Sequence, residues 1–190
     1  MSLTEIMDER AMDEDSDLFS ASLLDRLPNQ RHENGLLVRP LRSTDYDKGF
    51  VQLLSQLTEV GNVSKDQYLN RFSKMKHADG YYVVIVEDLD SGKVIGSATL
   101  VVEQKFIHNC GLRGRLEDVV VNSDYRGKQL GKLLVTTISQ LARRLHCYKL
   151  SLDCRDRLIP FYESLGYQCE PGNANSMNIR FESSVEQSRL

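Results

Sequence analysis

An apolar strand runs into a basic, glycine-containing loop and then a helix in Leu116-Glu117-Asp118-Val119-Val120-Val121-Asn122-Ser123-Asp124-Tyr125-Arg126-Gly127-Lys128-Gln129-Leu130-Gly131-Lys132-Leu133-Leu134. Gly127 and Gly131 allow the backbone to approach a ligand closely, and the helix adds the positive end of its dipole. Arg126, Lys128 and Lys132 bring further positive charge. A glycine-basic loop taken alone is more often a solvated turn, but the flanking strand and helix favour a pyrophosphate site.

Hydrophobic periodicity predicts the elements on both sides of this loop. A helix carrying Phe50, Leu53, Leu54 and Leu57 is expected, and Ser64 with Gln67 forms a capping box that predicts a second helix. A glycine in the turn 88–93 predicts an antiparallel hairpin. Strands are expected at residues 35–41, 81–87, 94–103, 115–121, 149–153 and 178–181, and further helices at residues 130–145 and 159–165.

Charge separates the N-terminus from the rest of the 190-residue chain. Residues 1–34 carry nine acidic side chains against three arginines, a net charge of −6, whereas the remaining chain has 18 acidic and 21 basic residues. We therefore expect an acidic, disordered tail at residues 1–34, with the alternative that Leu18-Phe19 and Leu23-Leu24 form a short amphipathic turn. One domain is expected at residues 35–182, followed by a C-terminal tail at residues 183–190.

Composition argues against several other classes of protein. No apolar run approaches the roughly 20 residues that a membrane helix requires, and the N-terminus lacks the order of a secretory signal. No basic stripe is interleaved with aromatic residues, so nucleic acid is not an expected partner. The four cysteines contain no Cys-x-x-Cys pair, which favours buried or half-buried free thiols over a zinc site or a disulfide framework.

Five segments in order resemble the GNAT acetyltransferase superfamily, and within it the eukaryotic glucosamine-6-phosphate N-acetyltransferase family. The segments are Lys105-Phe106-Ile107-His108, 115–121, 126–134, Cys147-Tyr148-Lys149 and Phe161-Tyr162, and the likeness runs from about Gly35 to Phe181. Arg126 and Gly131 match the ends of the superfamily's pyrophosphate motif, and Gln129 replaces its internal glycine. The segment 155–160 departs from the family, which usually has an asparagine there, so coenzyme contacts in it are in question.

The resemblance implies a mixed αβ (α+β) protein with the GNAT acyltransferase fold, a central twisted mixed sheet of about six to seven strands flanked by helices. It implies acetyl-CoA as cosubstrate, glucosamine 6-phosphate as acceptor, no metal, and a homodimer in which the last strand packs across the partner. A cytoplasmic location is expected, and peripheral association with internal membranes is left open. The implied product feeds UDP-N-acetylglucosamine synthesis.

The resemblance also assigns residues to the coenzyme and to catalysis. The Val119 N–H is expected to donate to the oxyanion, and Tyr162 to donate to the leaving thiolate. The alternative for Tyr162 is a core aromatic, a role we expect Phe161 to take. The expected coenzyme contacts are Val119, Val120, Val121, Arg126, Gly127, Lys128, Gln129, Leu130, Gly131, Lys132, Asp153 and Tyr162.

Neighbouring strand residues point to opposite faces, so Glu117 and Asp118 can both face a site only if a bulge intervenes. We expect Asp118 to hold the sugar or its amine, and Glu117 to orient substrate or accept a proton through water. The alternative is a structural ion pair with Arg115. Asp153 is a further candidate for positioning the amine, and direct attack is favoured over an acyl intermediate on Cys154.

The acceptor phosphate requires cations, for which the resemblance supplies Lys105, His108, Lys149 and Arg180. The full set of expected acceptor contacts is Thr58, Lys105, Phe106, Ile107, His108, Glu117, Asp118, Tyr148, Lys149 and Arg180. Two alternatives remain open, namely an acetyltransferase for another small amine or a protein, and a catalytically silent domain that binds acetyl-CoA.

Overall fold

The computed structural model describes residues 15–25, 27, 35–172 and 177–179. The chain divides into a larger unit that extends to Leu152 and a smaller unit that begins at Asp153. Residues within each unit contact mainly other residues of the same unit.

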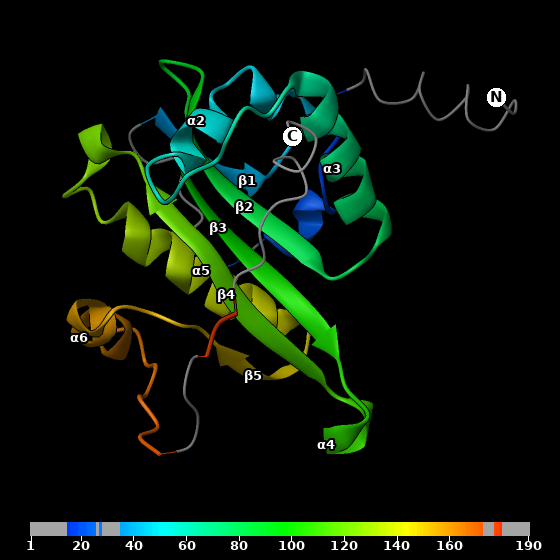
Figure 1. Ribbon diagram of the computed structural model, residues 1–190, viewed down its shortest axis with the longest axis vertical. Coiled ribbons are helices and arrows are strands. Elements are labelled where there is room, and N and C mark those ends of the chain that lie inside the picture. Colours follow the sequence, from blue (N-terminus) through cyan, green and yellow to red (C-terminus); the bar gives the residue numbers. More distant parts are fainter. Residues whose placement is uncertain (1–14, 26, 28–34, 173–176, 180–190) are drawn as a thin grey trace, which may run out of the picture. The chain divides into compact units, whose positions relative to one another are not determined.

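The larger unit contains a five-stranded sheet in the order β1-β2-β3-β4-β5 (Figure 1). The strands are β1 (Leu36–Pro40), β2 (Tyr81–Asp88), β3 (Lys93–Gln104), β4 (Leu112–Val121) and β5 (Cys147–Ser151). Strands β1 to β4 pair antiparallel with one another, whereas β5 pairs parallel with β4. The expected mixed sheet is confirmed, but with five strands in the described residues instead of six to seven. Asn178 and Ile179 are not in a strand, and residues 180–181 lie outside the described residues.

Helices cover both faces of this sheet. The long helix α5 (Leu130–Arg144) packs on β3 and β4, and a Cβ added at Gly96 of β3 would lie 3.2 Å from Leu134. On the other face, α2 (Phe50–Leu54) and α3 (Lys65–His77) join a core with Val83 and Ile85 of β2. Burial on both faces explains why β2 reads as a continuous apolar run.

Two predicted elements shift their boundaries, and one predicted cap is confirmed. The helix with Phe50 ends at Leu54, and Leu57 is 41% exposed, because the Ser55 hydroxyl donates to the Gln52 carbonyl and favours a turn there. The last strand of the sheet begins at Cys147 and ends at Ser151, two residues earlier than expected. The capping box at Ser64 is present as predicted, with the Gln67 N–H donating to the Ser64 hydroxyl.

The N-terminal segment contradicts the expectation of a disordered tail for residues 15–25. Leu18 and Leu24 are 4% and 1% exposed, and Ala21–Leu23 form the 3-10 turn η2. The Leu18 N–H donates to the Leu41 carbonyl, and Arg144 of α5 donates to the Ser22 and Leu23 carbonyls. Apolar burial therefore outweighs the acidic charge, and the alternative of a short amphipathic turn is the one observed.

Three of the four free thiols also differ from the expectation of buried or half-buried side chains, which Cys147 alone meets. Cys110, Cys154 and Cys169 are exposed, and Cys147 is partly buried. Cysteine is usually buried in folded proteins. These four cysteines lie near turns and strand ends, where the chain is open to solvent.

Candidate functional site

A β-bulge interrupts β4 at Asp118. Ser97 of β3 lies opposite Val120, and Thr99 lies opposite Glu117, so Asp118 and Val119 together face the single residue Ala98. Asp118 takes a φ of 51°, which a side chain other than glycine rarely adopts. This is the bulge that the adjacent carboxylates required, and it re-aims the backbone of β4 at this point.

The Asp118 carboxyl remains accessible to solvent but is partly desolvated by the protein around it. This desolvation raises its pKa, and the negative charge of Glu117 raises it further. A carboxylate whose charged form is disfavoured gains more than an ordinary one from a cationic or hydrogen-bonding ligand.

The two parallel strands separate just before the bulge. Pairing between β4 and β5 covers Leu112–Arg115 and ends where Arg115 lies opposite Ser151, whereas pairing with β3 continues to Val121. From Leu116 onward, the described residues of β5 provide no partner for that edge of β4. Backbone groups left without a ladder partner require another donor or acceptor, so this edge can hold an extended polar ligand.

Glu117 makes the ion pair that was the structural alternative. The Arg115 Nε donates to Glu117 Oε1 at 2.8 Å, across two residues of the same strand. The Glu117 side chain is still 40% exposed, so a second carboxylate oxygen remains accessible to water. The pair orients Glu117 without burying it.

The basic loop follows β4 through a single 3-10 turn, η5 (Ser123–Tyr125). Gly127 has a φ of 85° with open space around it, and Gln129 has a φ of 57° at the N-cap of α5. The Gln129 side chain does not cap the helix, which leaves the first N–H groups of α5 for another partner. Arg126, Lys128 and Lys132 are exposed beside them. This arrangement suits an anion such as pyrophosphate.

The predicted acceptor positions gather in part at the β3–β4 turn. This turn contains α4 (Ile107–Cys110), in which His108, Asn109 and Cys110 all have positive φ. The His108 ring stacks on Tyr148 of β5 at 4.1 Å, and Gly111 is tightly placed between them. The structure thus brings together two of the predicted acceptor positions, His108 and Tyr148.

Other acceptor positions are placed differently. Lys105 pairs with Glu103 at 2.6 Å, and Phe106 and Ile107 are 96% and 62% exposed. Thr58 lies exposed in the turn after α2, where its N–H donates to the Leu54 carbonyl. Arg180 lies outside the described residues, so a four-cation cluster stays a prediction.

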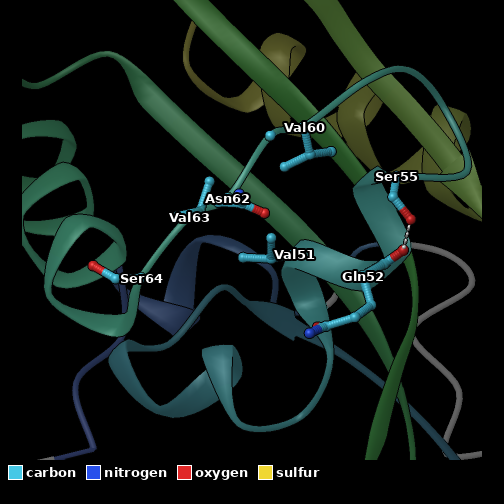
Figure 2. A pocket seen from close by; sticks show the side chains of 8 residues that line it. Val51, Gln52, Ser55, Val60, Asn62, Val63 and Ser64 are labelled. Carbon is cyan, nitrogen blue, oxygen red and sulfur yellow. Dashed lines mark hydrogen bonds between the residues drawn. The ribbon is translucent and has the colours of Figure 1, made fainter. Parts of the chain in front are cut away.

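An open hollow of about 440 Å³ lies between α2 and the segment before α3, near Thr58 in sequence (Figure 2). Figure 2 shows Val51, Val60 and Val63 along it, together with the polar side chains of Gln52, Ser55 and Asn62. None of the predicted site residues lines it. Gly61 has a φ of 71° here, a left-handed conformation that favours glycine. This glycine is therefore the residue in the sequence that could have indicated the turn.

The smaller unit places Tyr162 on α6 (Ile159–Glu163), which follows the 3-10 turn η6 (Asp156–Leu158). Tyr162 is buried and Phe161 only partly so, which reverses the expectation that Phe161 takes the core position. The Tyr162 ring packs against Phe161 and Tyr167 at 5.0 and 5.8 Å. Burial raises the pKa of the Tyr162 phenol, and nearby Cys154 raises it further, so the hydroxyl keeps its proton at neutral pH.

Asp153 and Cys154 are both exposed in this unit. Partial burial raises the pKa of the Cys154 thiol, and the charges of Asp156, Cys169 and Asp153 raise it further. A thiol held in its protonated form is a weak nucleophile.

Among the residues that the structure describes, none of the helices has the length and apolar character of a membrane span. The same residues contain no group of three or more His, Cys, Asp or Glu side chains that could hold a metal ion.

Comparisons with known proteins agree with this geometry. The model of the "Acetyltransferase (GNAT) family" matches residues 48–167. The chain is 63% identical over 150 residues to the "Probable glucosamine 6-phosphate N-acetyltransferase" of Drosophila melanogaster, covering 79% of this chain and 68% of that protein. It is 39% identical over 137 residues to "Glucosamine 6-phosphate N-acetyltransferase 1" of Dictyostelium discoideum, covering 72% and 87%.

A solved structure resembles this chain in both fold and sequence. The crystal structure of glucosamine-6-phosphate N-acetyltransferase from Arabidopsis thaliana superposes with a TM-score of 0.73 at 36% identity, covering 77% of this chain and 99% of that one. The bulged β4, the parting of β4 from β5 and the loop at the start of α5 all lie within the matched domain. The chain therefore belongs to the GNAT acetyltransferase family, in its glucosamine 6-phosphate N-acetyltransferase branch.

Proposed function

We propose that the protein transfers the acetyl group of acetyl-CoA to the amine of glucosamine 6-phosphate, giving N-acetylglucosamine 6-phosphate and CoA. The observation that carries this proposal is the bulge at Asp118, at the point where β4 parts from β5 and directly before the basic loop. One continuous segment thereby combines an open strand edge, a carboxylate and an anion site. These are the elements that a thioester donor with a pyrophosphate and an amine acceptor require together.

The coenzyme occupies the open edge of β4 and the loop that follows. Backbone groups of Val119–Val121 hold the pantetheine, and the loop 126–132 holds the pyrophosphate with its N–H groups and its three basic side chains. Val119 also donates its N–H to the oxyanion that forms when the amine attacks the thioester carbonyl. No metal is required for any of these steps.

The acceptor amine must be neutral and aligned with that carbonyl. Asp118 accepts a hydrogen bond from the sugar or its amine, and Asp153 helps to position the amine. Glu117, oriented by Arg115, takes the amine proton through water. Attack is direct, and the protonated Cys154 thiol supports this choice over an acyl-enzyme.

The leaving thiolate receives a hydrogen bond or a proton from Tyr162, whose phenol stays protonated at neutral pH and can therefore donate. The acceptor phosphate lies against cations of the β3–β4 turn and β5, with His108 held in place by Tyr148. Arg180 contributes from the C-terminal segment, in the homodimer that the family resemblance implies. Sedimentation of the purified protein checks the dimer.

The test follows release of free thiol with a colorimetric reagent. The wild-type protein is expected to release CoA only when acetyl-CoA and glucosamine 6-phosphate are both present. Tyr162→Phe keeps the ring but removes the hydroxyl, so kcat should fall on the order of tenfold to a thousandfold while KM changes less.

The matched control is Tyr167→Phe, which removes the hydroxyl of a ring that packs on Tyr162. It should keep kcat within about twofold of wild type, within the usual effect of a change away from the chemistry. An unchanged kcat in Tyr162→Phe, under conditions where chemistry limits turnover, would remove Tyr162 from the mechanism.

A further inference from the structure

Tyr125 is the last residue of η5 and directly precedes the basic loop. Its hydroxyl donates to Asp88 Oδ2 at 2.5 Å, and its ring lies 4.8 Å from the Lys128 ammonium. One side chain therefore contacts both a fixed point of the sheet and a cation of the loop. A cation over an aromatic face is attracted by the ring quadrupole, which restricts where Lys128 can go.

Asp88 is held in place by its neighbours. It ends β2, is 9% exposed and lies opposite Lys93 in the β2–β3 ladder. Ser91 donates its hydroxyl to Asp88 Oδ2 at 2.8 Å, and the Asp90 N–H donates to Oδ1 at 3.1 Å. The hydrogen bond from Tyr125, followed by that from Ser91, lowers the pKa of Asp88, so the carboxylate is charged at neutral pH. The bond to Tyr125 is therefore charge-assisted.

The other end of η5 is also held. The Ser123 N–H donates to Gln56 Oε1 at 2.8 Å, and the Asp124 N–H donates to Asn122 Oδ1 at 3.0 Å. In the loop that follows, the Arg126 N–H donates back to the Ser123 carbonyl of η5, the side chains of Arg126, Lys128 and Gln129 are exposed, and Gly127 has open space around it. The position of this loop is thus set mainly by the turn before it and by α5 after it.

We propose that Tyr125 is a positioning residue for the coenzyme, which fixes the start of the pyrophosphate loop and the place of Lys128 through its bond to Asp88. The inference rests on the proposed function, because it assumes that the loop binds the pyrophosphate of acetyl-CoA. A loop ordered in advance loses less conformational freedom on binding, so the anchor raises affinity for the coenzyme. It should not affect the chemical step once the coenzyme is bound.

The test measures acetyl-CoA binding by calorimetric titration, together with steady-state kinetics. Tyr125→Phe keeps the ring under Lys128 and removes only the hydroxyl. The Kd and KM for acetyl-CoA should rise about threefold to tenfold, the effect of one net hydrogen bond. The kcat and the KM for glucosamine 6-phosphate should stay at wild-type values. Tyr125→Leu, which also removes the aromatic face, should raise the Kd further.

A second donor separates positioning from general damage. S-acetylpantetheine carries the thioester without the pyrophosphate, so Tyr125→Phe and wild type should use it with equal kcat/KM. Tyr46→Phe is the matched control, because it removes the hydroxyl of a tyrosine that donates to the Val63 carbonyl and contacts neither Asp88 nor the loop. It should leave the Kd for acetyl-CoA within about twofold of wild type.

An unchanged Kd in Tyr125→Phe would overturn the inference while leaving the proposed function intact. An equal loss with both donors, or an equal loss in Tyr46→Phe, would also overturn it, because the effect would then be structural. A wild-type protein that does not bind acetyl-CoA would overturn the proposed function first, and this inference with it.

Discussion

At the scale of single residues, Asp118 combines a rare backbone conformation with a disfavoured charge. Its positive φ belongs to the bulge, and its pKa is raised by partial desolvation and by Glu117. The folded state therefore favours the protonated form of this carboxyl. Above the raised pKa the carboxyl is charged, and this charge lowers the free energy of unfolding. Such strain and charge persist where function requires them.

Asp118→Asn is expected to raise the free energy of unfolding at neutral pH, because it removes this charge. The gain should be under about 1 kcal/mol, since the group is partly exposed and screened by water. It should shrink as pH falls through the raised pKa and vanish below the unfolded pKa, where both states hold the proton. Denaturant unfolding between neutral pH and about pH 4 checks this, and the same variant should lose activity. A lower free energy of unfolding for Asp118→Asn at neutral pH would contradict the raised pKa of Asp118.

The sequence indicates that Glu117 and Asp118 could face the same site only through a bulge, but it does not show that one exists. The bulge depends on how β4 pairs with β3, which is a contact between residues about twenty positions apart. The same holds for the three left-handed residues of α4, because His108 is held by Tyr148 from another strand. Local pattern identifies such residues as candidates, and tertiary pairing decides their conformation.

At the scale of elements, the unit of strand, loop and helix around Arg126 is predicted almost completely from sequence. Its pattern changes from the apolar run Val119–Val121 at the end of β4 to helical spacing in α5, and a glycine marks the turn between them. The parting of β4 from β5 is not predictable in this way. It depends on the register of a parallel pair, which begins at Cys147 and ends at Ser151.

Gly127→Ala tests the loop as an element, and Gly61→Ala is its matched control. Both glycines have positive φ and open space where a Cβ would be added, so both substitutions should cost about 1 kcal/mol of backbone strain. Only Gly127 lies in the predicted pyrophosphate loop, so only Gly127→Ala should raise the Kd for acetyl-CoA, by about threefold or more. Equal Kd values for the two variants in calorimetric titration would contradict the loop assignment.

At the scale of the whole chain, the acidic N-terminal segment is part of the folded unit over residues 15–25. Composition predicts a solvated tail, because charge dominates any average over residues 1–34. Burial is decided by single side chains, and here Leu18 and Leu24 enter the core while Asp17 pairs with Arg42. The rest of residues 1–34 stays a prediction.

Leu24→Ala is expected to lower the free energy of unfolding by about 2 to 4 kcal/mol, because the leucine is 1% exposed and leaves a cavity. Leu57→Ala, at a leucine that is 41% exposed, is the matched control and should cost less than about 0.5 kcal/mol. Urea unfolding followed by circular dichroism measures both. Equal small losses would show that the segment around Leu24 does not stabilise the domain in solution.

The central claim is that the protein acetylates a phosphorylated amino sugar. It is tested most directly by the ratio of kcat/KM for glucosamine 6-phosphate to that for glucosamine, with acetyl-CoA saturating. The unphosphorylated sugar loses charge-assisted hydrogen bonds worth roughly 1.5 to 3 kcal/mol each, so two such bonds predict a ratio of at least about a hundred. Lys149→Ala should lower that ratio by raising the KM for the phosphorylated sugar alone. A ratio near one in the wild-type protein would contradict the account.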